Sequence, residues 1–215
     1  MKIVVYTANL GGYDKQQDWI EDDGVQYIRF TDEDVKKYKE LEGLSPRRQS
    51  RYFKMLPHAV LPNHDVSIWV DSCLKLINPL SKLVESLDLD ASSLFIPEHP
   101  NDGNVWEQFQ TIEKYGLEEP EMLQKTYKAL RVSGHNLDDV KLTENCIIIR
   151  TQATDAIMFN ELWWMYYNRL SQRDQLTSPL AMQASNVRLQ YLDFHSRTNT
   201  WYTNWGNHLK SRKVV

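Results

Sequence analysis

The sequence is poor in cysteine, with only Cys73 and Cys146 among its 215 residues. Neither belongs to a C-x-x-C pair or to a set of cysteine and histidine ligands, which argues against a zinc site. The sequence also lacks any run of about 18 apolar residues of the kind that crosses a membrane. A domain of this length buries roughly 70% of the surface that its unfolded chain exposes, so it needs no disulfide. We therefore expect a cytoplasmic protein with no integral membrane segment.

An excess of positive charge and a glycine-rich nucleotide-binding motif are lacking as well. The 29 acidic residues outnumber the 25 lysines and arginines, and the formal net charge is −4. This balance argues against a general affinity for nucleic acid, and we expect no nucleic-acid partner. Gly11 and Gly12 follow the first expected strand, but neither G-x-G-x-x-G nor G-x-x-x-x-G-K-[ST] is present there. A Rossmann dehydrogenase or a P-loop enzyme is therefore disfavoured.

What the sequence does contain is an alternation of strand and helix patterns. Short apolar or β-branched runs predict strands at 2–9, 25–30, 66–71, 94–97, 146–149 and 187–194. Apolar spacings of three and four predict helices at 47–60, 105–115 and 120–130, and a long aromatic helix with Thr154 as N-cap. Pro57 is expected to bend or end the first of these helices early. The alternation predicts a single α/β domain over 1–215 with a mostly parallel sheet, and a tail, 196–215, packed on it or partly flexible.

Two aspartates stand out because of the predicted elements that they adjoin. Asp71 ends the most continuous apolar strand pattern, and ligands of such sheets bind outside the carboxyl ends of the strands. A carboxylate there usually has a metal, hydrogen-bond donors or a basic partner, although capping of the following turn explains it equally well. Asp174 begins a helix pattern, where backbone amides can hold a functional carboxylate. Ser171 and Asp174 also have the spacing of a capping box, which would account for both.

Positive charge is concentrated along one predicted helix. The residues are Arg47, Arg48, Arg51 and Lys54. This arrangement suits a phosphate or diphosphate ligand, and it suits a solvated helix face equally well.

Several strings of residues together resemble a known family. They are Lys2 to Asn9 with Gly12-Tyr13-Asp14, Tyr27 to Asp32, Arg51 to His58, Ser67 to Asp71, Glu98-His99-Pro100, Glu144-Asn145 with Ile147 to Arg150, and Trp163-Trp164 leading to Ser171 to Leu176. Over nearly all of residues 1 to 185 the chain is similar to the plant mucilage-related and turgor-regulating glycosyltransferases, once described only as a domain of unknown function. The resemblance implies a GT-A-like fold: a mostly parallel central sheet flanked by helices, with a nucleotide-sugar donor held across the carboxyl ends of its strands.

The resemblance also implies an activity, the transfer of a sugar from a nucleoside diphosphate sugar to an acceptor hydroxyl of a carbohydrate or glycoconjugate in polysaccharide or glycoconjugate synthesis. Asp71 takes the place of the first aspartate of the metal-binding D-x-D motif. The motif here reads Asp71-Ser72-Cys73, and a thiol does not replace the hard oxygen ligand that Mg²⁺ or Mn²⁺ prefers. A weakly bound Mn²⁺ or Mg²⁺ on Asp71 and His195 and a metal-independent transfer therefore both stay open.

The expected roles of single residues follow from this chemistry. The leaving diphosphate needs positive charge, which we expect from Arg51 and Lys54, helped by Arg47, Lys75 or His195. We expect Asp174 to act either as a general base towards the acceptor, which would invert the anomeric centre, or as a ligand of sugar hydroxyls. The residues expected in the nucleoside pocket are Thr7, Asn9, Tyr13 and Asp32. Those expected on the sugar or acceptor side are Glu98, His99, Arg173 and Gln175.

Two other functions stay open at the level of sequence. The incomplete metal motif is compatible with a non-catalytic module that has the same fold and binds nucleotide sugars or carbohydrates. The D-x-K spacing of Asp139-Val140-Lys141 is that of some metal-dependent nucleases and phosphodiesterases, but no expected strand upstream supplies a partner carboxylate.

Overall fold

A computed structural model describes residues 1–100, 103–134, 136, 138 and 140–204. Asp139 of the D-x-K string and the tail from residue 205 onward lie outside the described residues. No helix in the described part of the chain is both long enough and apolar enough to cross a lipid bilayer.

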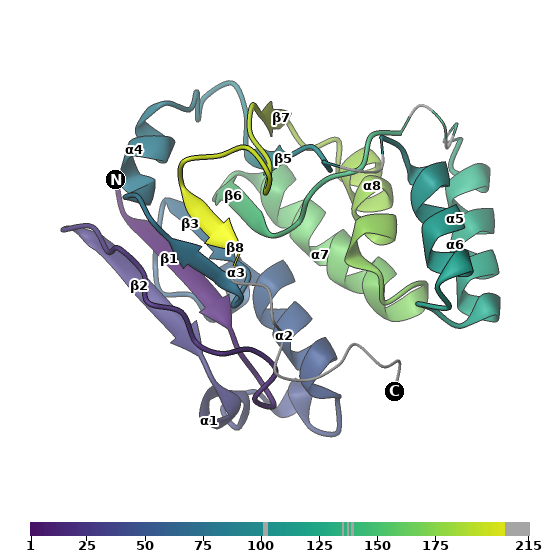
Figure 1. Cartoon of the computed structure of the whole chain (residues 1–215), viewed down its shortest axis with the longest axis horizontal. Coiled ribbons are helices and arrows are strands. Elements are labelled where there is room, and N and C mark those ends of the chain that lie inside the picture. The colour runs from purple at the N-terminus through teal and green to yellow at the C-terminus, as the bar shows by residue number, and fades with distance from the viewer. Residues whose placement is uncertain (101–102, 135, 137, 139, 205–215) are drawn as a thin grey trace.

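Six strands form the central sheet, in the spatial order β2-β1-β3-β6-β5-β7 (Figure 1). They are β1 (Ile3–Ala8), β2 (Val25–Phe30), β3 (Val66–Val70), β5 (Leu94–Pro97), β6 (Ile147–Thr151) and β7 (Leu189–Leu192). Only β6 runs antiparallel to its neighbours among these strands. The predicted α/β class and the mostly parallel sheet are confirmed, and the carboxyl ends of the five parallel strands lie at one edge.

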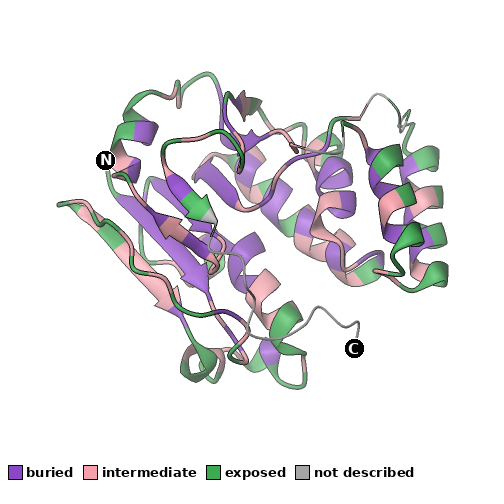
Figure 2. Ribbon diagram, in the orientation of Figure 1, coloured by how far each residue is buried: buried purple, intermediate pink, exposed green. Residues whose placement is uncertain are grey.

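The central strands are buried on both faces because helices or a second sheet cover each side (Figure 2). Every residue of β1 and β3 is buried, which explains their continuous apolar runs. Val4 and Tyr6 of β1 pack into the core shared with α2 (Pro46–Met55), α7 (Thr154–Arg169) and α8 (Asp174–Ser185). Ile3 and Val5 point to the other core, against α4 (Leu80–Glu85) and the small sheet of β4 (Leu74–Leu76) and β8 (Tyr202–Asn204).

The remaining helices lie around this two-sided core. They are α1 (Asp32–Val35), the 3₁₀ helix η1 (Lys39–Leu41), α3 (Pro57–Val60), α5 (Val105–Lys114) and α6 (Pro120–Val132). Helices α5 and α6 stand side by side next to α8 (Figure 1), and a third apolar cluster joins the three.

The ends of the helices confirm one sequence prediction and correct two. Pro57 ends α2 at Met55, as predicted, because proline cannot continue the helical hydrogen bonding. The N-cap of α7 is Ala153, whereas Thr154 is the first helical residue. The capping box of Ser171 and Asp174 is absent: Asp174 is the first residue of α8, and the Ser171 hydroxyl donates to Glu118 Oε2 (2.7 Å). The carboxylate of Asp174 is therefore available to other partners.

Candidate functional site

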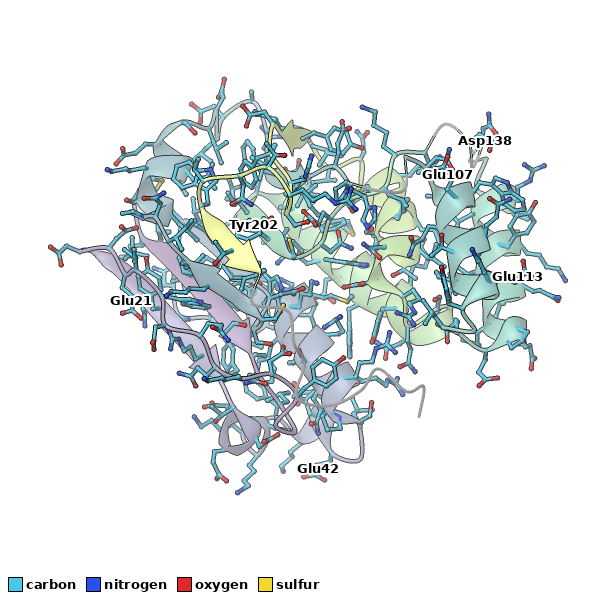
Figure 3. The ribbon with its side chains drawn as sticks, in the orientation of Figure 1. Glu21, Glu42, Glu107, Glu113, Asp138 and Tyr202 are labelled. Carbon is cyan, nitrogen blue, oxygen red and sulfur yellow. The ribbon has the colours of Figure 1, made fainter. Side chains whose placement is uncertain are left out.

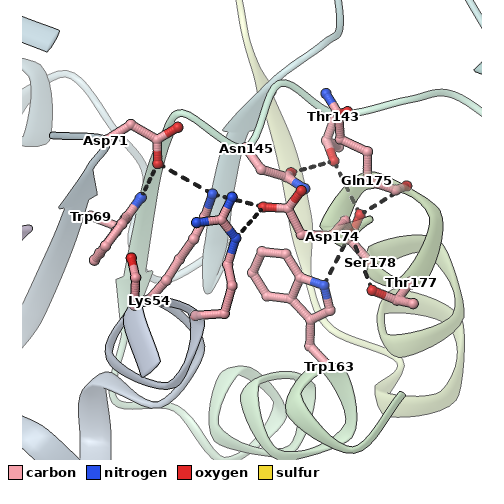
Figure 4. A network of polar contacts seen from close by, with 12 residues as sticks. Lys54, Trp69, Asp71, Thr143, Asn145, Trp163, Asp174, Gln175, Thr177 and Ser178 are labelled. Carbon is pink, nitrogen blue, oxygen red and sulfur yellow. Dashed lines mark hydrogen bonds and ion pairs between the residues drawn. The ribbon is translucent and has the colours of Figure 1, made fainter. Parts of the chain in front are cut away.

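Four charged side chains meet at the carboxyl edge of the sheet (Figure 4). Lys54 Nζ lies 3.3 Å from Asp71 Oδ1 and 2.9 Å from Asp174 Oδ2, although Lys54 and Asp174 are 120 positions apart in the sequence. Arg51 Nε lies 3.2 Å from the same oxygen of Asp174. These four residues, termed the charged cluster below, bring together four of the residues singled out from the sequence.

Local structure explains why the four side chains converge. Arg51 and Lys54 are three residues apart in α2 and therefore share one helix face. Asp71 directly follows the buried strand β3, and Asp174 is the first residue of α8. The cluster thus lies where α2, β3 and α8 meet, at the edge of the sheet where such folds bind ligands.

Two tryptophans support the aspartates, and neither was singled out from the sequence. Trp69 Nε1 donates a hydrogen bond to Asp71 Oδ1 (2.6 Å), and Trp163 Nε1 donates to the backbone carbonyl of Asp174 (3.1 Å). A signal for Trp69 was present, since residues two apart on a strand face the same side. No comparable signal marks Trp163, because its partner lies in the next helix.

Burial and charge act on the cluster in opposite directions. The side chain of Lys54 is 1% exposed, and those of Asp174 and Asp71 are 15% and 30% exposed. Burial raises the pKa of Asp174, but the charges of Lys54, Arg51 and Arg47 outweigh it and hold that pKa well below its usual range. Burial lowers the pKa of Arg51, and the negative charge of Asp174 more than reverses this. The pair is therefore fully ionised at neutral pH.

The other basic residues of α2 also face the protein. Arg47 Nη2 donates to the carbonyl of Gln172 (2.7 Å), and Arg48 Nη2 donates to Asn168 Oδ1 (2.5 Å). The basic face of α2 is therefore not simply exposed to solvent, because its side chains contact other parts of the protein. Lys75, named as a further source of positive charge, lies on β4 opposite Thr203 of β8.

A small cavity of about 50 Å³ lies beside the carboxyl ends of β1 and β2. Of the four residues expected in the nucleoside pocket, Thr7 and Asn9 line it, whereas Tyr13 and Asp32 do not. Its other lining residues are Gln16, Gln17, Trp19, Arg29, Phe30, Thr31 and Ser72. The Thr7 hydroxyl is buried and has no hydrogen-bond partner among the described residues. Ser72 neighbours Asp71, so the cavity adjoins the charged cluster.

Asn9 and Asp32 are engaged in holding the glycine loop that follows β1. The side chain of Asn9 donates to the carbonyl of Asp14 (2.8 Å) and accepts from its amide (3.1 Å). Asp32 Oδ1 accepts from the amide of Gly11 (2.9 Å). Gly11 has a φ of +64°, a conformation that glycine adopts without strain. These contacts give both side chains a structural role in the loop after β1.

A second, more open hollow of about 400 Å³ lies at the carboxyl ends of β5 and β7. Its lining residues are Glu98, Tyr191, Leu192, Asp193, Phe194 and His195. Glu98 Oε1 pairs with Lys141 Nζ at 2.6 Å. The backbone amide of the neighbouring His99 donates to the backbone carbonyl of Leu142 (2.9 Å). The expected acceptor residue Glu98 thus lies in a hollow on the same sheet edge as Asp71.

Arg173 and Gln175, the other two residues expected on the sugar side, contact the region of α5 and α6. Arg173 Nε donates to the carbonyl of Leu117 (3.0 Å), and Gln175 Oε1 accepts from Gln108 (3.4 Å). Both contacts tie the start of α8, where Asp174 lies, to the region of α5 and α6.

A metal ion was expected on Asp71 and His195. Within the described part of the chain, no three His, Cys, Asp or Glu side chains are grouped so that they could hold a metal ion. Asp71 Oδ1 already accepts from Trp69 and pairs with Lys54. His195 lines the hollow beside Glu98, and Cys73 offers a soft thiol. Binding of Mg²⁺ or Mn²⁺ by Asp71 and His195 thus stays a prediction.

Comparison with known proteins adds three findings. A family model described as TOD1/MUCI70, glycosyltransferase-like domain, matches residues 34–198. The probable hexosyltransferase MUCI70 of Arabidopsis thaliana is 25% identical over 139 residues, 61% of this chain and 24% of that protein, so the chain spans about a quarter of this relative. Mouse xyloside xylosyltransferase 1 has a TM-score of 0.47 at 9% identity (89% of this chain, 84% of that chain), and galactosyltransferase LgtC has 0.43 at 10% (88% and 72%).

Proposed function

Since the chain belongs to the TOD1/MUCI70 glycosyltransferase-like domain family, we propose that it transfers a sugar from a nucleoside diphosphate sugar to an acceptor hydroxyl of a carbohydrate or glycoconjugate. The observation that carries the proposal is the charged cluster. It sets Lys54 between the carboxylates of Asp71 and Asp174, with Arg51 on Asp174, at the sheet edge where α/β folds bind their ligands.

The proposed role of the cations is to neutralise the leaving group. Transfer builds negative charge on the departing diphosphate, and preorganised positive groups stabilise that charge. With Arg47 included, the cluster carries one positive charge in excess over its two carboxylates, so it attracts an entering diphosphate. Lys54 in this proposal supplies, beside Asp71, the charge that a divalent ion would otherwise supply.

The low pKa of Asp174 supports one of the two roles expected for it. An effective general base has a pKa near the operating pH, whereas Lys54 and Arg51 hold the pKa of Asp174 below its usual range despite burial. A carboxylate that stays ionised is a good acceptor of hydrogen bonds from hydroxyl groups. We therefore assign Asp174 to holding sugar hydroxyls and orienting the cations, and not to removing the proton of the acceptor.

The cavity and the hollow are the proposed sites of the remaining substrate groups. The nucleoside would enter at the cavity beside β1 and β2, which Trp19 helps to line and where the Thr7 hydroxyl has no hydrogen-bond partner among the described residues. The acceptor would approach from the hollow at β5 and β7, where Tyr191 lies beside the carboxylates of Glu98 and Asp193. The sheet edge between them holds Asp71, where transfer would occur.

The proposal is tested by comparing two aspartates at opposite ends of the same strand. Thermal-shift screening with nucleotide sugars, with and without Mn²⁺, first identifies the donor, since a ligand of the native state raises the melting temperature. Asp71→Asn should then lower donor turnover by about 100-fold in protein that is still folded at the assay temperature. Asp65→Asn, directly before β3, should leave turnover unchanged.

Three outcomes would count against the proposal. Unchanged turnover in Asp71→Asn would remove the role of the charged cluster, and an equal loss in Asp65→Asn would show a general structural effect. If the protein binds a UDP- or GDP-sugar but shows neither transfer nor hydrolysis with any divalent ion, it is a non-catalytic binding module.

A further inference from the structure

Arg150 on β6 is a buried cation without a buried anion. Its exposed fraction is 0%, and within the described part of the chain no carboxylate lies within ion-pair distance of it. Its Nη1 donates to the hydroxyl of Tyr6 and to the backbone carbonyl of Lys54, both at 3.0 Å. Its Nε and Nη2 have no hydrogen-bond partner in that part of the chain. Burying an uncompensated guanidinium is costly, so its hydrogen bonds to Tyr6 and to the Lys54 carbonyl are important for keeping it in the core.

The carbonyl of Lys54 needs these donors because of where α2 ends. In a continuing helix it would accept from the amide four residues later, but α2 ends at Met55 and Pro57 begins a new turn. Tyr6 donates to the same carbonyl from its hydroxyl (3.2 Å). A cation is also favourable at the negative end of a helix dipole. Arg150 and Tyr6 thus hold the backbone of Lys54 from inside the core.

The two aromatic supports of the charged cluster lie against the same pair. The guanidinium of Arg150 lies 5.8 Å from the ring centre of Trp163, the residue that binds the backbone of Asp174. The ring of Tyr6 packs edge-on against Trp69 at 5.3 Å, and Trp69 binds the carboxylate of Asp71. Arg150 and Tyr6 therefore contact the backbone of Lys54 directly. They also contact the two tryptophans that hold Asp71 and Asp174.

We propose that Arg150, acting with Tyr6, is a positioning residue that fixes the backbone of Lys54 so that its ammonium stays between Asp71 and Asp174. The inference rests on the geometry of the cluster, and it bears on the proposed function only through the role given there to Lys54. Without these two donors the carbonyl of Lys54 at the end of α2 is buried and unpaired. The backbone from which the Lys54 side chain extends is then no longer held in one position.

The test measures the accessibility of the Lys54 ammonium and needs no substrate. Acetic anhydride acetylates lysine amines, and mass spectrometry gives the rate at each site. In the natural protein Lys54 should react far more slowly than the exposed Lys82. Arg150→Met should raise the rate at Lys54 by about tenfold or more while the rate at Lys82 stays constant, because a buried acceptor loses its donor. Tyr6→Phe, which removes only a hydroxyl, should raise it by a smaller factor.

Asp155→Asn is the matched control, since it breaks a polar contact at the N-terminus of α7 that involves no member of the cluster. It should lower the melting temperature without changing acetylation of Lys54. The proposal is overturned if folded Arg150→Met shows no increase, or if Asp155→Asn gives an equal one. If Arg150→Met does not fold, Tyr6→Phe decides in the same way. A protein that lacks transferase activity would leave this result untouched, so the two proposals fail separately.

Discussion

At the scale of single residues, Lys54 decides the electrostatics of the site. One ammonium, 1% exposed, lies within 3.3 Å of two carboxylates. At an effective dielectric constant of about 20, a contact of this length is worth roughly 5 kcal/mol. Removing each charge from water costs several kcal/mol, so the net gain is small although the loss of one partner is large. The cluster is therefore sensitive to the removal of any one charge.

Asp174→Asn should lower the free energy of unfolding by about 3 kcal/mol at pH 7, because Lys54 and Arg51 lose a buried counter-ion. The pKa of Asp174 is depressed in the folded state. Its stabilising contribution is therefore complete above the unfolded-state pKa of about 3.9 and is lost as the pH falls towards the folded value. Urea denaturation at pH 7 and at pH 3 measures the effect, and the gap between the two proteins should narrow at pH 3.

Asp90→Asn provides the comparison, since residue 90 is exposed and remote from the cluster. It should change the free energy of unfolding by less than about 0.5 kcal/mol at both pH values. A gap between Asp174→Asn and the natural protein that widens at pH 3 would contradict the ionised pair described above.

Sequence reasoning found the charged residues of the cluster but not what supports them. The spacing of Arg51 and Lys54 predicts that they share a helix face, and Asp71 follows a continuous apolar run that predicts a strand. Each could therefore be found from its neighbours in the sequence. The Ser171–Asp174 capping box was wrong because a local pattern cannot show that Glu118 takes the serine hydroxyl. The contact of Trp163 joins two consecutive helices, and the hydrogen bonds of Arg150 join elements far apart in the sequence. No spacing in the sequence reveals either.

At the scale of elements, the short strands β4 and β8 form a cover over one face of the sheet. Tyr202 of β8 is 2% exposed and packs into the core with Phe194. Figure 3 shows it within the body of the fold, whereas the labelled Glu42 and Glu113 lie at the periphery. Its hydroxyl lies 3.4 Å from Cys146 Sγ and 3.5 Å from Glu144 Oε2. Three-residue strands give too little alternation to be predicted, and β4 and β8 pair across more than 120 residues of sequence.

Tyr202→Ala should lower the free energy of unfolding by about 3–5 kcal/mol, because it removes a fully buried ring and leaves a cavity. Tyr202→Phe keeps the ring and loses only two long polar contacts, and should cost about 1 kcal/mol. Urea denaturation of both variants provides the measurement. A loss in Tyr202→Phe as large as that in Tyr202→Ala would show that the hydroxyl, and not the packing, anchors β8.

The N-terminus of α7 is joined to β5 and β7 through one carboxylate. Asp155 Oδ2 accepts from the Ser93 hydroxyl (2.7 Å) and from the backbone (3.0 Å) and side chain (3.1 Å) of Arg188. Burial raises the pKa of Asp155, but these donors and the charge of Arg188 outweigh it and lower the pKa to about 2. The carboxylate is thus a junction between a helix and the far edge of the sheet.

Asp155→Asn should therefore destabilise the protein by about 1 kcal/mol at pH 7, a value kept small by solvent screening. Because the folded pKa is depressed, the difference should be constant above pH 4 and disappear as the pH falls through about 2. Thermal melts across that range provide the test. A difference that persisted undiminished at pH 2 would assign the effect to hydrogen-bond geometry and not to the charge.

At the scale of the whole molecule, sequence periodicity predicted the class of the fold but not its strand order. The runs at 25–30 and 94–97 match β2 and β5 at both ends, because burial on a pleated strand leaves a local pattern. The antiparallel direction of β6 leaves no local pattern in the sequence, because a short apolar run is the same for a parallel and an antiparallel strand. The hollow at β5 and β7 likewise follows from strand order, which explains why His195 lies beside Glu98.

This arrangement leads to a prediction about divalent ions. If Lys54 supplies the charge beside Asp71, dialysis against EDTA should change the affinity for UDP or GDP by no more than about twofold. Arg51→Ala should weaken the same affinity by about 10- to 100-fold, since hydrogen bonds to charged groups are the strong ones. Arg131→Ala, on the exposed side of α6, should have no effect. Isothermal titration calorimetry measures all three. A loss of more than tenfold after EDTA that Mn²⁺ restores would mean that a metal, and not Lys54, holds the diphosphate at Asp71.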